Sequence, residues 1–238
     1  MWEGNTRLTQ QTRVDVAHKI VLASRRASAT DSAGGSSSGW QGPRSEPALD
    51  VKYSPDGSLL AVGGRDCFIH IYDVAAGYTL LGQCSGHRAQ VMHLDWSENS
   101  AQLRSNDGLH QLLYWNARKC TQLTSAFRMR NTRWATTNCV LGWALQGVWR
   151  DTVDDTAVVA VARSHGGNTV LASDDCNNVR MFRYPCLVGA DYDTAHGHMC
   201  QVKRIRWMHD DRRVVTIAGV DPCIFQWRHV TSTGETVA

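Results

Sequence analysis

Three side chains that commonly bind metal ions stand at alternating positions near the C-terminal end of the sequence. His196, His198 and Cys200 lie in the segment HGHMC, and on a strand all three would share one face. A protein zinc site usually has four well-spaced ligands, or three ligands and a water molecule. No C-x-x-C motif is present to complete such a set. We therefore expect no metal site here, and His198 receives a structural explanation from the repeats described below.

Acidic side chains form three adjacent pairs that could support carboxylate chemistry. The pairs are Asp154–Asp155, Asp174–Asp175 and Asp210–Asp211. Each pair lies in a predicted turn or loop, where aspartate is favoured because its side chain accepts hydrogen bonds from the local backbone. The sequence holds no G-x-S-x-G, P-loop or H-E-x-x-H motif. We therefore expect no catalytic residues, no cofactor and no enzyme activity.

Basic residues gather in two short segments, and either group could attract an acidic partner. Arg128, Arg130 and Arg133 lie in FRMRNTRW. The second group lies in VKRIRW and comprises Lys203, Arg204 and Arg206. The simpler interpretation of both groups is ordinary solvated side chains on strand edges. Of the two, the first is the better candidate for partner binding, because loops carry binding residues more often than strands do.

The overall composition suits a globular protein and argues against several functional classes. Hydrophobic residues make up 42% and charged residues 20% of the 238-residue chain. The net charge of +3 is too small to suggest nucleic-acid binding, and no apolar run approaches the roughly 18 residues of a membrane span. The N-terminus lacks the pattern of a secretory signal. We therefore expect a cytoplasmic protein whose eight cysteines are reduced thiols.

The amino-acid composition and the hydrophobic pattern of the sequence change near residue 47. Residues 27–46 are rich in Ser, Gly and Ala, so we expect residues 1–46 to be a flexible N-terminal segment, with one candidate strand at residues 14–22. From Ala48 onward, short apolar runs alternate with Gly, Asp and Asn turns, which is typical of a sandwich, barrel or propeller. We expect the folded repeats to span residues 47–230 and a tail to follow at residues 231–238.

A repeat decides among these all-β architectures. Asp66 precedes Tyr72 by six residues, as Asp221 precedes Trp227, and Trp115 and Phe182 end equivalent strands. The four aromatic residues are separated by 43, 67 and 45 residues, and a WD-repeat blade spans about 40–45 residues. The longer spacing predicts an insertion at about residues 125–152, which contains Trp134, Trp143 and Trp149. We expect these tryptophans to pack the insertion onto the repeats; the alternative is an exposed interface hot spot.

Two Gly-His dipeptides support the repeat. Their histidines are His87 and His198, and each dipeptide precedes a strand-end tryptophan by a similar distance. The order Gly-His, strand, turn, strand, Asp turn, strand, Trp is the WD-repeat signature. In this order Asp66 and Asp221 are structural rather than catalytic. The repeats are imperfect, because Leu109 and Cys176 occupy the Asp position of the second and third units. The sequence thus predicts four blades of an all-β propeller.

Several sequence segments within these blades resemble those of the echinoderm microtubule-associated protein-like family. The similarity runs from about Ala48 to Val230, and residues 1–46 do not share it. Its most specific segments are CSGHRAQVMHLDWSENSAQL, LYW, RWATTNCVLGWALQGVW, SDDCNNVRMFRYPC and FQWRHV. A generic WD repeat does not require the tryptophan-rich insertion or the Tyr-Pro-Cys tripeptide.

The resemblance implies a function as well as a fold. Members of this family have two joined propellers, and a segment like this one closes the second. They bind microtubules or soluble tubulin in the cytoplasm or an axoneme, which makes tubulin the expected partner and the microtubule cytoskeleton, or a cilium, the expected location. The alternative is a generic WD-repeat scaffold that recruits another protein complex, for example a ciliary one, through the propeller rim. Because four blades of a longer ring would leave open edges, we expect a fragment of a longer product or closure by a partner.

Overall fold

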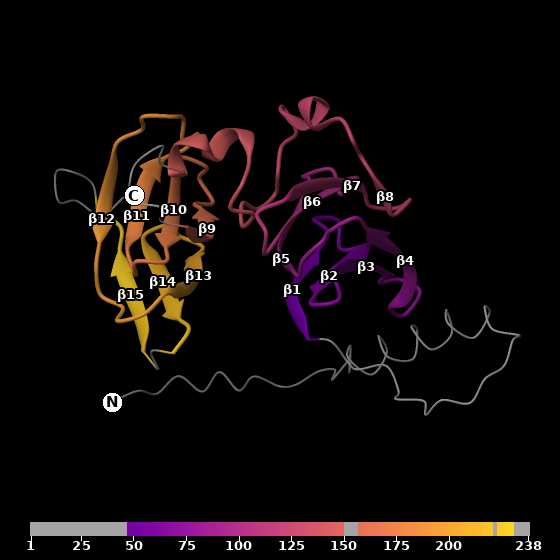
Figure 1. Ribbon diagram of the computed structural model, residues 1–238, viewed down its shortest axis with the longest axis horizontal. Helices are drawn as coiled ribbons and strands as arrows, with labels where there is room; N and C mark the ends of the chain where they lie inside the picture. Colours follow the sequence, from indigo (N-terminus) through magenta and orange to yellow (C-terminus); the bar gives the residue numbers. More distant parts are fainter. Residues whose placement is uncertain (1–46, 150–156, 221–222, 231–238) are drawn as a thin grey trace, which may run out of the picture.

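Tight turns join short antiparallel strands into four consecutive sheets, which we call blades 1 to 4 in chain order (Figure 1). The computed structural model describes residues 47–149, 157–220 and 223–230. The segment 1–46 with its candidate strand, the tail 231–238, the pair Asp154–Asp155, and Asp221 all lie outside the described residues. The fold is an all-β, four-blade propeller arrangement, so the fold class predicted from the sequence is confirmed.

Each blade is a meander in which sequential strands pair with one another. Blade 1 contains β1 (Ala48–Tyr53), β2 (Leu59–Gly64), β3 (Phe68–Asp73) and β4 (Thr79–Ser85). Blade 2 contains β5 (Val91–Trp96), β6 (Gln102–Asp107), β7 (Leu112–Asn116) and the short β8 (Thr121–Gln122). Blade 3 contains β9 (Val158–Arg163), β10 (Thr169–Asp174), β11 (Val179–Arg183) and β12 (Tyr192–Ala195). Blade 4 has three strands within the described ranges: β13 (Val202–Trp207), β14 (Arg213–Ala218) and β15 (Ile224–Arg228).

A repeated hydrogen bond aligns the first strands of the four blades. The residue after each first strand donates its backbone N–H to the carbonyl oxygen five residues later, at 2.8–2.9 Å. These pairs are Ser54–Leu59, Ser97–Gln102, Ser164–Thr169 and Met208–Arg213. The residues that stand two positions before these four donors therefore occupy equivalent places on the first strands. They are Lys52, Asp95, Ala162 and Arg206. The first strands lie innermost, because β1 packs against β5 and β9 packs against β13.

The apolar core lies mainly between blades that pack as pairs. Blades 1 and 2 share a buried cluster that includes Ile69, Leu94 and Trp115, and blades 3 and 4 share one that includes Ile205. The same tryptophan hydrogen bond links both pairs. In each pair, a tryptophan ends the first strand of the second blade, and its indole N–H donates a hydrogen bond of 3.0 Å to a backbone carbonyl of the first blade. The residues are Trp96 and Lys52 in one pair, and Trp207 and Ala162 in the other.

The insertion joins one pair of blades to the other, and in Figure 1 it passes from blade 2 at the right to blade 3 at the left. It carries two short 3₁₀ helices, η1 (Ala126–Met129) and η2 (Trp143–Val148). Between them the chain runs beside the end of β5, where the N–H of Ala135 donates 2.9 Å to the carbonyl of Trp96. Helix η2 then docks on blade 3, since Ala144 and Gly147 exchange backbone hydrogen bonds with Cys186.

Candidate functional site

A buried hydrogen-bond network occupies blade 2. The ring of His87 lies 2.6 Å from the hydroxyl of Ser105 and 3.2 Å from a carboxylate oxygen of Asp107. The indole N–H of Trp115 donates to the same Ser105 hydroxyl at 2.8 Å. The structure therefore joins His87 and Trp115, two of the residues singled out in the sequence, through a serine that the sequence reasoning missed.

Blade 4 repeats most of this network. The ring of His198 lies 2.8 Å from the hydroxyl of Thr216, and the indole of Trp227 donates to that hydroxyl at 2.8 Å. Thr216 and Ser105 stand 11 and 10 residues before their tryptophans. A serine or threonine at this spacing is the sequence signal that could have identified the hydroxyl of each network. His198 is thus engaged inside blade 4. Among the residues that the structure describes, no three or more His, Cys, Asp or Glu side chains gather as a metal site.

The aspartate of the blade 2 network is not at the position inferred from the sequence. Leu109 was assigned to the Asp position, but its side chain is 68% exposed. Asp107, two residues earlier, accepts the backbone N–H groups of Leu109 and Gln111 and contacts His87. Burial by itself raises the pKa of Asp107, but these donors and His87 hold it below its usual value. The hairpin keeps the register of blade 1, because Leu103 pairs with Trp115 as Leu60 pairs with Tyr72; the aspartate occupies the last residue of β6 instead of the turn.

Blade 3 shows the same shift of two residues. Cys176 was assigned to the Asp position, yet it is Asp174 whose carboxylate accepts the backbone N–H groups of Cys176 and Asn178. The guanidinium of Arg180 lies 2.7 Å from the other carboxylate oxygen. Phe182 is buried and stacks at 5.3 Å on Tyr192. This blade has no His–Ser–Trp network, because neither the histidine nor the tryptophan is present in it.

Blade 1 uses its signature residues differently. Asp66 accepts the backbone N–H of Phe68 and lies 2.7 Å from the ring of His70. Tyr72 is buried in an apolar cluster with Leu60, and its hydroxyl has no hydrogen-bond partner within the described part of the chain. Burial accordingly raises the pKa of Tyr72. Asp66 and Tyr72 are therefore not joined in one network, in contrast to His87 and Trp115.

The blade 2 network has the composition of a Ser–His–Asp catalytic triad but not its accessibility. Both side chains of the His87–Asp107 pair are 0% exposed, and Ser105 is also fully buried. The Ser105 hydroxyl already has two partners, so it offers no free nucleophile to a substrate. Burial lowers the pKa of His87, with Asp107 acting in the opposite direction, which favours the neutral ring. The geometry supports a structural role.

A carboxylate that the sequence reasoning overlooked fixes the insertion in place. Asp95, at the end of β5, is fully buried and receives a double hydrogen bond of 3.0–3.1 Å from Arg104. It also accepts hydrogen bonds of 2.6–3.0 Å from Thr136, Asn138 and Cys139 of the insertion. Burial would raise the pKa of Asp95, but Arg104 and these donors hold it below its usual value. No local motif marks Asp95, because its partners in the insertion lie 41–44 residues away.

The tryptophans of the insertion divide between packing and exposure. Trp134 is buried, lies 5.9 Å from the ring of Tyr114 and carries the Arg104 guanidinium over its face at 4.7 Å. The Trp149 indole donates 2.8 Å to the carbonyl of Val140. Trp143, in contrast, is 38% exposed. Two of the three therefore pack the insertion onto the blades, and the third reaches the surface.

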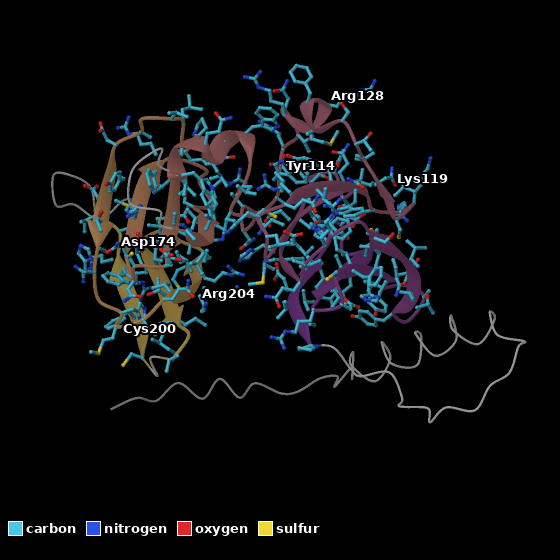
Figure 2. The ribbon with its side chains drawn as sticks, viewed as in Figure 1. Tyr114, Lys119, Arg128, Asp174, Cys200 and Arg204 are labelled. Carbon is cyan, nitrogen blue, oxygen red and sulfur yellow. The ribbon has the colours of Figure 1, made fainter. Side chains whose placement is uncertain are left out.

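The first basic group lies on the surface of the insertion. Arg128, Arg130 and Arg133 are all exposed, and Figure 2 shows Arg128 on η1 at the outer edge of the molecule. The guanidinium of Arg130 lies 5.8 Å from the ring centre of Trp143, so η1 and η2 contribute to one surface. We call this surface the insertion patch. It comprises Phe127, which is 72% exposed, with Arg128, Arg130, Arg133 and Trp143.

The second basic group does not form one surface. Lys203 is exposed, but Arg204 is partly buried and donates 3.0 Å to the carbonyl of Leu49, which brings blade 4 against blade 1. Figure 2 shows Arg204 pointing toward the middle of the molecule. The interpretation as solvated side chains on strand edges is therefore wrong for Arg204.

Comparison with known proteins identifies the family. The family model for the echinoderm microtubule-associated protein second beta-propeller matches residues 27–229, so the similarity begins upstream of the expected Ala48. Echinoderm microtubule-associated protein-like 2 from Rattus norvegicus is 41% identical over 182 residues. Echinoderm microtubule-associated protein-like 3 from Homo sapiens is 40% identical over 189 residues. These alignments cover 75% and 77% of this chain but only 28% and 21% of the relatives.

Solved structures agree on the fold. The beta-propeller domain of Cps50 (Swd1) from Myceliophteria thermophila superposes with a TM-score of 0.57 over 80% of this chain and 67% of that structure, at 14% identity. No helix within the described ranges is long and apolar enough to cross a membrane.

The family resemblance inferred from the sequence motifs is confirmed by the family model and by relatives about 40% identical. The chain therefore belongs to the echinoderm microtubule-associated protein-like family, within which it matches the second β-propeller.

Proposed function

We propose that this chain is a non-enzymatic WD-repeat interaction module that binds microtubules or tubulin. The observation that carries the proposal is its identity of about 40% with relatives that are named microtubule-associated. The same names favour the microtubule cytoskeleton of the cytoplasm as its location, and they do not point to a cilium. The buried His–Ser–Asp network supports the non-enzymatic part, because a substrate cannot reach it.

The insertion patch is the surface that we propose for the contact. Its three arginines are exposed, and the Arg133–Glu98 pair, at 3.9 Å with side chains 85% and 51% exposed, leaves the Arg133 charge largely available. An exposed phenylalanine and tryptophan stand beside them. Aromatic and arginine side chains are the residues that most often anchor protein interfaces, and positive charge steers an acidic partner toward the surface.

The test is microtubule co-sedimentation of the 1–238 chain at low and moderate salt, using protein shown to be monodisperse by light scattering. We expect saturable pelleting that weakens with salt and falls at least tenfold in affinity when Arg128, Arg130 and Arg133 are all changed to Gln. The matched control changes three other exposed arginines to Gln and should retain affinity within about twofold: Arg88, Arg183 and Arg228. Equal losses in both variants would reduce the contact to net charge and refute the assigned surface. Folded protein that does not pellet would leave the generic scaffold as the better function.

A further inference from the structure

A pocket of about 210 Å³ opens where the innermost strands of blades 1, 3 and 4 end. Lys52, Ala162 and Arg206, which occupy equivalent positions on β1, β9 and β13, all line it. In blade 2 the equivalent residue is Asp95, and there the insertion covers β5 and contributes residues 135–138 to the wall. The small side chain of Ala162 leaves space that a larger residue would fill. The pocket is therefore a product of the arrangement of the blades and the insertion.

Three cations line this pocket, and within the described ranges one of them, Lys52, acts on a nearby carboxylate: its charge opposes the burial that raises the pKa of Asp50. Within the described ranges, Lys52, Arg163 and Arg206 form no ion pair. Arg163 donates 2.7 Å to the carbonyl of Trp134, and Arg206 donates 2.9 Å to the carbonyl of Ile205. Both acceptors are neutral, so neither arginine charge is compensated by these contacts.

The nearby carboxylates are already engaged elsewhere. Asp95 is bound by Arg104 and by donors of the insertion. Asp211 accepts the backbone N–H groups of His165 and Gly166 and lies 2.8 Å from the His165 ring. Asp50 accepts the backbone N–H of Leu94 at 2.8 Å, and none of these three aspartates is among the residues that line the pocket. The wall therefore carries an excess of positive charge.

The pocket wall also holds a buried hydroxyl without a partner. Thr137 is 3% exposed, and its hydroxyl meets no hydrogen-bond partner within the described part of the molecule. A buried polar group without a partner is destabilising, so such a group calls for an explanation. Its neighbours Thr136 and Asn138 have their side chains bonded to Asp95. An acceptor atom bound in the pocket would satisfy Thr137.

We propose that this pocket binds a phosphate monoester dianion carried on a serine or threonine side chain of a partner protein. Three cations, against one nearby carboxylate that interacts with Lys52, suit a group with two negative charges better than a carboxylate with one. Arginine binds phosphate through paired N–H donors, and lysine binds it as a point charge. Pockets for drug-sized ligands span about 300–1,000 Å³, so a pocket of 210 Å³ is suited to a single modified side chain.

The experiment titrates the 1–238 chain with O-phosphoserine, inorganic phosphate, glutamate and serine, by isothermal titration calorimetry at low salt. We expect O-phosphoserine to bind saturably and at least tenfold more tightly than glutamate, and serine not to bind. Inorganic phosphate should compete with O-phosphoserine. Binding of inorganic phosphate with exclusion of O-phosphoserine would refute a peptide-borne group. Equal binding of glutamate would refute the phosphoryl specificity, and absence of saturable binding would refute the site.

Variants locate the binding in this pocket. Lys52→Gln and Arg206→Gln should each weaken O-phosphoserine binding at least tenfold, whereas Arg183→Gln, at an exposed position of blade 3, should change it less than twofold. Thr137→Val keeps the side-chain shape and removes the unpartnered hydroxyl. It should weaken binding at least threefold while the thermal unfolding midpoint stays the same or rises. Equal losses in Arg183→Gln would assign the effect to net charge and overturn the proposal. None of these readouts involves microtubules, so the outcome is independent of the proposed function.

Discussion

Buried charge at the end of β5 shows how one side chain can fix a whole segment. Asp95 has Arg104 on one side and the insertion on the other, and it accepts hydrogen bonds from both. Both residues are almost completely buried. A buried ion pair contributes little to stability compared with a well-packed apolar pair. Removal of one partner, however, leaves the other charge buried without a counter-charge. Asp95 is therefore more sensitive to substitution than a surface carboxylate.

The substitution Asp95→Asn should lower the free energy of unfolding by about 3–5 kcal/mol, because it leaves the Arg104 guanidinium buried without a counter-charge. The control is Glu98→Gln, which removes the carboxylate of the exposed Arg133–Glu98 pair. Exposed pairs of this kind typically contribute less than about 1 kcal/mol. Urea unfolding followed by tryptophan fluorescence measures both variants. Similar losses for the two variants would contradict the assigned role of Asp95.

We expect the free energy of unfolding to depend on pH through the buried side chain of His93. Burial, reinforced by the charge of Arg204, lowers the pKa of His93 to about 4. An unfolded histidine has a pKa of about 6.5, so the unfolded chain takes up the proton first as pH falls. The contribution of the neutral ring is complete above pH 6.5 and is lost as pH falls toward 4. The linked change is about 3 kcal/mol.

The measurement is the free energy of unfolding between pH 7 and pH 4.5. We expect it to fall in the natural chain and to fall less steeply in His93→Leu, which has no titrating ring at this position. His196→Gln, at an exposed position, serves as the control and should keep the natural slope. An unchanged slope in His93→Leu would show that other groups control the acid sensitivity.

At the scale of elements, the insertion is built as a connector. Its middle runs along β5 of blade 2, and η2 docks on the loop that follows β11 in blade 3. Val140, Leu145 and Val148 belong to the same buried cluster as Phe182 of blade 3. The insertion therefore contributes core to blade 3 as well as a surface patch. A loop that only presented residues to a partner would not need this apolar contact.

Close approach at Gly147 makes the docking of η2 testable. A Cβ atom at this position would lie 1.9 Å from the carbonyl oxygen and 2.6 Å from the carbonyl carbon of Leu187. Gly147→Ala should therefore push η2 away from blade 3 and cost about 2–3 kcal/mol, since overpacking of this kind is not relieved by side-chain motion. Gly166→Ala is the control, because its nearest neighbour is a side-chain oxygen at 3.4 Å. Differential scanning calorimetry should show a lower midpoint for the first variant alone.

At the scale of the whole molecule, the four blades form two pairs. Blades 1 and 2 share one core cluster, and blades 3 and 4 share another. Contact between the pairs comes from the insertion and from Arg204, which reaches the carbonyl of Leu49. Because shared burial sets which parts of a protein open together, each pair should behave as a local unit of stability.

Equivalent tryptophans allow this pairing to be tested symmetrically. Trp96→Phe removes the hydrogen bond from blade 2 to blade 1, and Trp207→Phe removes the same bond from blade 4 to blade 3. Each change should cost about 1 kcal/mol or more. Hydrogen exchange read by mass spectrometry should show lost protection in β1–β7 for the first variant and in β9–β15 for the second. Uniform loss of protection across all blades in either variant would show that the four blades open as one unit.

The sequence by itself determined the features that depend on local order. The spacing of Tyr72, Trp115, Phe182 and Trp227 set the number of blades, because each strand and turn is specified by residues close together in the chain. The Gly-His dipeptides pointed to His87 and His198, which the structure places in hydrogen-bond networks. The turns of blades 2 and 3 keep the length of the blade 1 turn, but their aspartates occupy the last residue of the second strand, two residues before the inferred positions. A fixed spacing to the aromatic residue does not predict this difference.

Only the tertiary structure decided which distant residues meet. The partners of Asp95 in the insertion lie more than 40 residues away, and Arg204 contacts a carbonyl 155 residues earlier in the chain. Residues 52, 162 and 206 carry no shared motif, yet the ring places them around one pocket. Such contacts follow from how blades pack on one another, and many sequences with the same strand pattern would pack with different side chains at the axis. The repeat pattern specifies that blades form, whereas the packing of the blades specifies which side chains meet between them.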